Sequence, residues 1–162
     1  MSVSLYGESP GIDWRPVSSQ LALARRVSSL LGGLPVLLGV AIAAALWTRW
    51  LWLLVAVIAG CLALTLALIG RQVAAISYVE LPDEIVIRRG RLFRRLESIP
   101  YGRLQYADMQ SGPMERRLGL ASVTIHTANP ESGGTIPGLP LPEAEALRER
   151  LTARGEAQRA GL

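Results

Sequence analysis

The side chains best suited to binding a ligand are arginines, which gather in two short segments of the chain. These candidates are Arg88, Arg89, Arg91, Arg94, Arg95, Arg116 and Arg117. A guanidinium group can bind a phosphate or carboxylate with two parallel hydrogen bonds. The seven residues are therefore candidate contacts for an anionic lipid or a partner protein. The plainer alternatives are that residues 88–95 hold the chain against anionic lipid nonspecifically, and that the 116–117 pair stabilises a short helix.

Other reactive side chains do not form a pattern typical of an enzyme. His126 is the only histidine, and it lies in an alternating segment without a neighbouring cysteine or serine motif. Asp83 and Glu84 are adjacent, so a strand would direct them to opposite faces. Cys61 is the only cysteine, which leaves no Cys/His pattern for a metal. We therefore predict a non-enzymatic protein without catalytic residues, metal or cofactor.

The charge of the chain has two interpretations. All 17 basic residues are arginine, the formal net charge is +4 and the pI is about 10, which could suggest a nucleic-acid partner. However, many arginines flank apolar segments, where anionic headgroups attract each by about 1 kcal/mol. This placement predicts the lipid bilayer as a partner and no nucleic acid.

The apolar segment 27–70 determines where these arginines lie. Arg49 is its only formally charged residue. About 20 apolar residues cross the hydrocarbon as a helix, so the segment predicts two transmembrane helices, Val27 to Leu46 and Leu51 to Ile69, joined by a short turn. A signal peptide would have one shorter apolar core near the start of the chain, and two soluble core helices would each carry a polar face.

The sequence also predicts how this hairpin packs and how it is oriented. Gly39 and Ala43, like Ala56 and Gly60, are four residues apart, a spacing that lets two helices approach closely in lipid. Arginines precede the first helix and follow the second, and positive residues remain in the cytoplasm. We therefore expect a multi-pass inner-membrane protein with both termini cytoplasmic. Trp47, Trp50 and Trp52 would form an interfacial belt at the outer turn.

Short strands and turns are expected in the rest of the chain. Residues 1–26 form an N-terminal cytosolic segment, loop-like to residue 19, with a helix starting at Gln20 and with Trp14 either on the headgroups or on the domain. Alternating or β-branched segments predict strands at 76–81, 84–89, 91–96, 103–110, 121–127 and 135–137, with a helical turn within 111–119. A final helix from Pro142 to Arg154 ends at Gly155, and residues 156–162 form a disordered tail. The cytosolic domain thus spans residues 71–155.

Three segments carry a resemblance to a known family. They are Asp83 to Leu92 (DEIVIRRGRL), Ile99 to Gln105 (IPYGRLQ) and Glu115 to Ala121 (ERRLGLA). Together with the preceding helix pair, they resemble the bacterial pleckstrin-homology (PH) family of membrane proteins, and in particular its small YdbS-like branch. The resemblance implies an α+β membrane protein, in which the transmembrane hairpin precedes a PH-like antiparallel β-sandwich or partly open barrel capped by a C-terminal helix.

The same resemblance implies a function without supplying catalytic residues. It implies assembly with itself, as a homo-oligomer, or with larger relatives that carry several PH domains, in envelope maintenance. We therefore expect the cytosolic domain to be a protein-interaction or assembly module. The alternative is a module that binds anionic lipid headgroups through the basic 88–95 hairpin, although the lysine-containing headgroup pattern of this fold is missing here.

Overall fold

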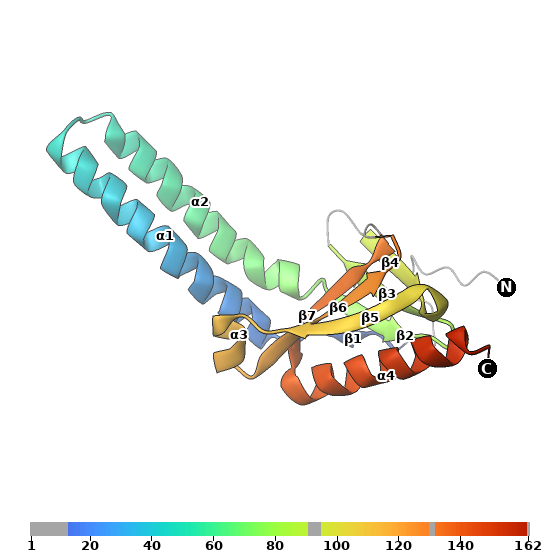
Figure 1. Cartoon of the computed structure of the whole chain (residues 1–162). Helices are drawn as coiled ribbons and strands as arrows, with labels where there is room; N and C mark the ends of the chain where they lie inside the picture. Colours follow the sequence, from blue (N-terminus) through green and yellow to red (C-terminus); the bar gives the residue numbers. More distant parts are fainter. Residues whose placement is uncertain (1–12, 91–94, 130–131, 162) are drawn as a thin grey trace.

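Two long helices project from a small domain of strands and helices (Figure 1). The computed structural model describes residues 13–90, 95–129 and 132–161. Helix α1 is Gln20–Leu46 and helix α2 is Leu51–Val73, and the two pair as an antiparallel hairpin. Their bounds confirm the expected helix start at Gln20 and the turn at residues 47–50.

The helix pair has the length and surface of membrane-spanning helices. Both helices are long and apolar enough to cross a membrane. Only 6% of the apolar 18-residue stretch of each helix is buried. Exposed large hydrophobic side chains lie almost entirely in α1, α2 and their turn; among the described residues of the domain only Tyr106 and Leu141 join them. Core helices of a soluble protein are mostly buried, so that alternative does not fit.

The contact between the two helices differs from the expected one. Leu62 of α2 packs closely over Gly33 of α1, whereas nothing lies within 4 Å of the Cβ positions of Gly39 and Gly60. The predicted interface through Gly39, Ala43, Ala56 and Gly60 is therefore wrong. Positions six apart on a helix differ in direction by about 240°, so packing at Gly33 turns Gly39 away from α2.

Seven strands form two antiparallel sheets. The first sheet has the order β1-β2-β3-β4, and the second has the order β5-β6-β7. Their bounds are β1 Arg15–Pro16, β2 Ser77–Glu80, β3 Glu84–Arg89, β4 Arg95–Pro100, β5 Leu104–Gln110, β6 Leu120–Thr127 and β7 Gly134–Pro140. Strand β6 buries Ala121, Val123, Ile125 and Thr127, the face that its alternation predicted. Strand β1 was missed: residues 15–16 were expected to be loop, yet they pair with β2.

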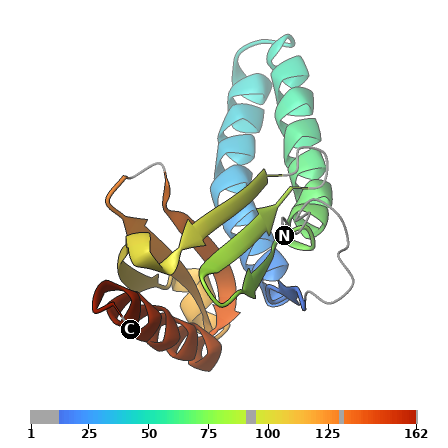
Figure 2. The same cartoon turned by 90° about the vertical axis from the view of Figure 1, so that its right-hand side faces the viewer.

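Three shorter helical elements complete the domain. They are the 3₁₀ turn η1 Tyr101–Arg103, α3 Pro113–Arg117 and α4 Leu141–Arg159. Helix α3 matches the helical turn expected within 111–119. Helix α4 lies on the domain side farthest from the hairpin tip (Figure 2) and buries Ala144, Leu147 and Leu151, the predicted apolar stripe.

The end of α4 corrects two predictions. Gly155 does not end the helix, which continues to Arg159, so a disordered tail from residue 156 is wrong. Gly155 is buried, and a Cβ there would lie 3.1 Å from Leu104 Cδ2. Its role is close helix–sheet contact. The left-handed glycine after the helix is Gly161, with a φ of 76°.

The first turns of α1 belong to the core of the domain. Leu21 is 1% exposed and clusters with Val17, Ile69 and Val73 against side chains of both sheets. It lies directly over Gly138 of β7, whose φ of 67° and missing Cβ permit this approach. The Ser18 N–H also donates to the Gly138 carbonyl at 3.1 Å. The helix hairpin is thus fixed to the domain by a packed joint.

Candidate functional site

The basic hairpin predicted as a contact site is formed by β3 and β4. Arg89 pairs with Arg95 across the two strands, and Gly90 begins the turn with a φ of 83°. The end of this hairpin at which β3 finishes and β4 begins, which we call its open end, lies on the side of the domain from which α1 and α2 project (Figure 2). Arg91 and Arg94, two of the candidate residues, lie outside the described residues.

Arg88 and Arg89 have partners inside the domain. The Nε of Arg88 donates to Ser77 Oγ at 3.2 Å, and its guanidinium lies 4.5 Å from the centre of the Trp14 ring. Trp14 therefore packs on the domain, one of its two expected positions. Arg89 Nη2 donates to the Thr135 carbonyl of β7, which ties the first sheet to the second. Both guanidinium groups thus have a structural use.

Arg95 is more available than its two neighbours. Its side chain is 75% exposed and forms an ion pair with Glu97 at 3.2 Å, also in β4. An exposed pair of this kind contributes little to stability. Of the described arginines in the hairpin, Arg95 is therefore the one best placed to meet an external anion.

Arg116 and Arg117 are exposed at the end of α3. The start of this short helix is held by Glu115, which accepts hydrogen bonds from the Gly112 N–H at 3.0 Å and from Ser122 Oγ at 3.3 Å. No hydrogen bond or ion pair joins the side chain of either arginine to another described residue. Their position in the last turn suits the helix dipole, but both guanidinium groups remain open to a ligand.

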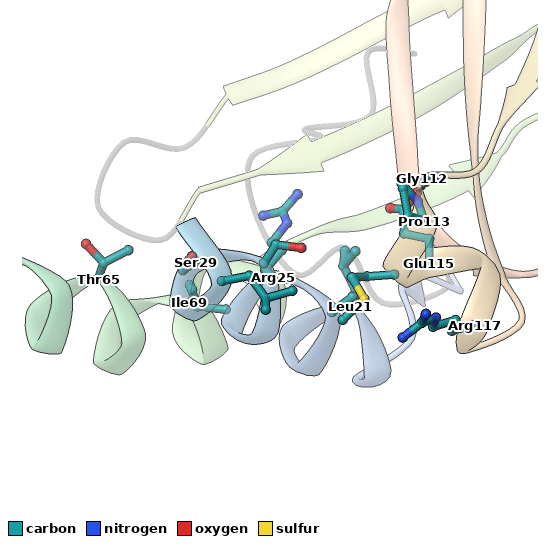
Figure 3. Close-up of a pocket in the computed structure, with 13 residues that line it drawn as sticks. Leu21, Arg25, Ser29, Thr65, Ile69, Gly112, Pro113, Glu115 and Arg117 are labelled. Carbon is teal, nitrogen blue, oxygen red and sulfur yellow. Dashed lines mark hydrogen bonds between the residues drawn. The ribbon is translucent and has the colours of Figure 1, made fainter. Parts of the chain in front are cut away.

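A groove runs between α1, α2 and α3, and sequence reasoning missed it (Figure 3). Its volume is about 790 Å³. Leu21, Leu31, Ile69 and Met114 are among the side chains that form its apolar wall, and polar groups come from Arg25, Ser28, Ser29, Glu115 and Arg117. Because the three segments are about 40 residues apart in sequence, only the fold brings them together. The one sequence signal for the groove was Arg117, a candidate contact for an anionic lipid or a partner protein.

A second charged cluster fastens α4 to β2. Glu80 accepts hydrogen bonds from Arg150 at 2.7 and 3.2 Å and forms an ion pair with Arg154 at 3.6 Å. The hydrogen bond and charge of Glu80 raise the pKa of Arg150. Arg154 also donates to the Tyr101 hydroxyl at 2.7 Å. The arginines of this cluster are paired with groups of the protein, so we interpret the cluster as a structural clamp between α4 and β2.

Two buried tyrosines next to this clamp are protonated at neutral pH. Burial, followed by the hydrogen bond and charge of Glu143, raises the pKa of Tyr78 above its ordinary value. The Tyr78 hydroxyl donates to Glu143 Oε1 at 2.7 Å. Burial likewise raises the pKa of Tyr101, although Arg154 opposes this shift. Neither phenol is therefore suited to act as a base.

An aromatic patch lies on the outer face of the second sheet. We define it as Tyr106, Thr124, His126 and Thr135. The rings of Tyr106 and His126 stack with centroids 4.4 Å apart and 14° between their planes, and Tyr106 is 55% exposed. These residues line a shallow hollow of about 500 Å³. His126 is thus a surface histidine stacked on a tyrosine.

Acidic residues do not assemble a metal site in the described part of the chain. No three of its His, Cys, Asp or Glu side chains are grouped so that they could hold a metal ion. Glu84 accepts a hydrogen bond from Ser98 Oγ, and the Asp83 carbonyl accepts one from the Tyr101 N–H. Both residues therefore support the β3–β4 hairpin and η1.

The comparison with protein families identifies the fold. The family model described as Bacterial PH domain matches residues 21–155, which include α2, strands β2 to β7 and most of α1 and α4. The chain belongs to the bacterial PH domain family. No curated protein and no solved structure matches it.

Membership in the bacterial PH domain family confirms the resemblance at the level of the family. The match begins at Leu21, the residue at the centre of the joint between α1 and the domain. The helix hairpin and the PH-like sheets therefore form one family unit. Assignment to the YdbS-like branch stays a prediction.

Proposed function

We propose that this bacterial PH-domain protein is a non-enzymatic inner-membrane protein whose PH-like domain is an assembly module. Its partners would be a second copy or larger relatives carrying several PH domains, and the process would be envelope maintenance. The observation that carries the proposal is the packed joint at Leu21, which is 1% exposed. A domain fixed to its membrane helices presents one face at a constant height and orientation, which suits assembly with a partner in the same membrane.

The proposed contact surface is the aromatic patch. Tyr106 is 55% exposed, which leaves a large aromatic ring open to a partner, and His126 stacks on this ring. Exposed tyrosines are enriched among the residues that dominate binding energy at protein interfaces. The neighbouring hydroxyls of Thr124 and Thr135 hydrogen-bond to each other at 3.3 Å and would form a polar border.

The assembly proposal predicts that Tyr106→Ala weakens complex formation about tenfold or more, because truncation of an interface tyrosine costs more than 1 kcal/mol. The measurement is the mass of the full-length protein, purified in mild detergent, as a function of concentration. Leu141→Ala is the matched control, since Leu141 is the other exposed large hydrophobic residue of the described domain, at 41%. A wild-type protein that is monomeric and retains no protein partner would contradict the proposal, as would equal effects of the two variants.

We place the domain and both termini in the cytoplasm. Arg25 and Arg26 precede the apolar part of α1 and Arg71 follows that of α2, whereas the turn between the helices carries Arg49 alone. In intact cells, external protease should leave the C-terminal helix α4 uncut, and disruption of the inner membrane should make it accessible. Cleavage within α4 before disruption would show that the domain lies outside the cytoplasm and would contradict this orientation.

Binding of anionic headgroups by the basic hairpin is a second candidate function. It is favoured by Arg95, which is 75% exposed at the open end of the β3–β4 hairpin. Against a specific site stand Arg88 and Arg89, whose guanidinium groups already contact Ser77 and Thr135. We therefore propose that this hairpin adds nonspecific attraction to anionic lipid, a contribution that would disappear at high salt.

A further inference from the structure

We propose that the groove between α1, α2 and α3 binds one anionic phospholipid of the surrounding bilayer. Arg117 would bind its headgroup, Arg25 would add attraction by its charge, and an acyl chain would lie along the apolar wall. The inference rests on membrane insertion of the hairpin and is independent of the assembly surface. The groove lies beside the membrane helices, away from the β3–β4 hairpin and from the aromatic patch.

The size and wall of the groove suit part of a lipid. Its volume of about 790 Å³ lies within the range of about 300–1,000 Å³ typical of ligand pockets. Leu21, Ile69 and Met114 line it from three different elements, and Leu31 is a further apolar side chain of α1 in its lining. Apolar walls of this kind favour a hydrocarbon chain over water.

Depth places the groove at the boundary between headgroups and acyl chains. If the hydrocarbon begins at Val27, the helical rise puts Arg25 about 3 Å outside this boundary and Leu31 about 6 Å inside it. Ser28 and Ser29 fall at the boundary itself and also line the groove. A phospholipid has its phosphate and its acyl chains at these same two depths.

The guanidinium groups of the groove have no polar partner in the described protein. Arg25 is half-buried and Arg117 is exposed, and neither side chain forms a hydrogen bond or ion pair with a described residue. Glu115 is the one acid at the groove, and its two oxygens accept hydrogen bonds from Gly112 and Ser122. Arg26, by contrast, packs its guanidinium over Gly70 of α2.

A guanidinium group at the level of the headgroups is attracted to anionic lipid by about 1 kcal/mol. Lipid phosphates are the anions found at this depth, and they accept charge-assisted hydrogen bonds from arginine. A groove with an apolar wall and two unpaired arginines at its rim therefore complements an anionic phospholipid better than it complements a neutral peptide.

The test is native mass spectrometry of the full-length protein released from nanodiscs of phosphatidylglycerol and phosphatidylcholine in equal amounts. We expect one phosphatidylglycerol retained per chain. Arg117→Gln should lower the retained fraction about tenfold or more, since it removes a charged hydrogen-bond donor. Arg116→Gln is the matched control, because Arg116 is also exposed on α3 but does not line the groove.

A second variant tests the groove without changing its charge. Ser28→Trp places an indole in the groove, and we expect it to abolish phosphatidylglycerol retention. The proposal is overturned if wild-type protein retains no lipid, if it retains both lipids equally, or if Arg116→Gln acts like Arg117→Gln. It is also overturned if Arg117→Gln dissociates a dimer or releases a peptide while no lipid is retained. Failure to retain lipid leaves membrane insertion and the Tyr106 test unaffected.

Discussion

Leu21→Ala should lower the free energy of unfolding by about 2–5 kcal/mol, because it deletes a fully buried side chain at the joint between α1 and the domain. Leu21 is 1% exposed and lies over Gly138, so sheet and helix leave a cavity between them when its side chain is shortened. A loss of this size corresponds to a fall in Tm of about 4–20 °C for a chain of this length.

The measurement for Leu21 is thermal unfolding of the full-length protein in detergent. Leu23→Ala is the matched control, because Leu23 lies two residues further along α1 and is 51% exposed. Its substitution should change the free energy of unfolding by about 0.5 kcal/mol or less. Equal melting temperatures for the two variants would mean that the hairpin is not packed into the domain, and the proposal of a rigid presenting domain would fail with it.

Leu38→Asp should prevent stable insertion of α1. Leu38 is 63% exposed and lies near the middle of the apolar segment 27–46. A carboxylate at the centre of a transmembrane helix costs about 2.5–3.5 kcal/mol on insertion scales. The same substitution at a water-exposed position would change stability by about 0.5 kcal/mol or less, so the two environments give very different results.

The measurement for Leu38 is the fraction of the protein that stays in the membrane pellet after alkaline carbonate extraction. Leu141→Asp is the control: Leu141 is 41% exposed in the domain, and an acid at the first residue of α4 suits the helix dipole. We expect this control to remain in the pellet. Retention of Leu38→Asp at the wild-type level would argue that this face of α1 does not meet lipid.

Patterns within single segments were sufficient to predict most of the elements. The apolar segment 27–70 gave both long helices, and the alternation from Ala121 to Thr127 gave the buried face of β6. The apolar stripe of α4 was likewise visible in its spacing. Each of these signals comes from residues that are neighbours along one helix or strand.

Features that depend on distant contacts could not be predicted in this way. Strand β1 has two residues and exists because β2, beyond both long helices, supplies its partner. Gly155 resembled a helix end, but its missing Cβ serves contact with Leu104. The spacing of Gly39 and Gly60 suggested a helix interface, whereas packing of Leu62 over Gly33 and the joint at Leu21 set the rotation of the hairpin.

The candidate arginines show the same limit. Their number and sequence spacing indicated an affinity for anions. Whether each guanidinium group is free to bind an external anion depends on the fold. Arg88 and Arg89 contact Ser77, Trp14 and Thr135, while Arg117 and Arg25 both line a groove that no single segment contains. Charge was thus visible in the sequence, and the partners of each charge were not.

Labelling of Cys61 tests membrane embedding of the hairpin most directly. Cys61 is the only cysteine of the chain and is exposed on α2. A maleimide reacts with the thiolate, a charged form that hydrocarbon disfavours. In native membranes opened to the reagent on both sides, a membrane-impermeant maleimide should leave Cys61 unlabelled and should label it fully after denaturation in SDS. Rapid labelling of Cys61 before denaturation would place α2 in water and contradict the account.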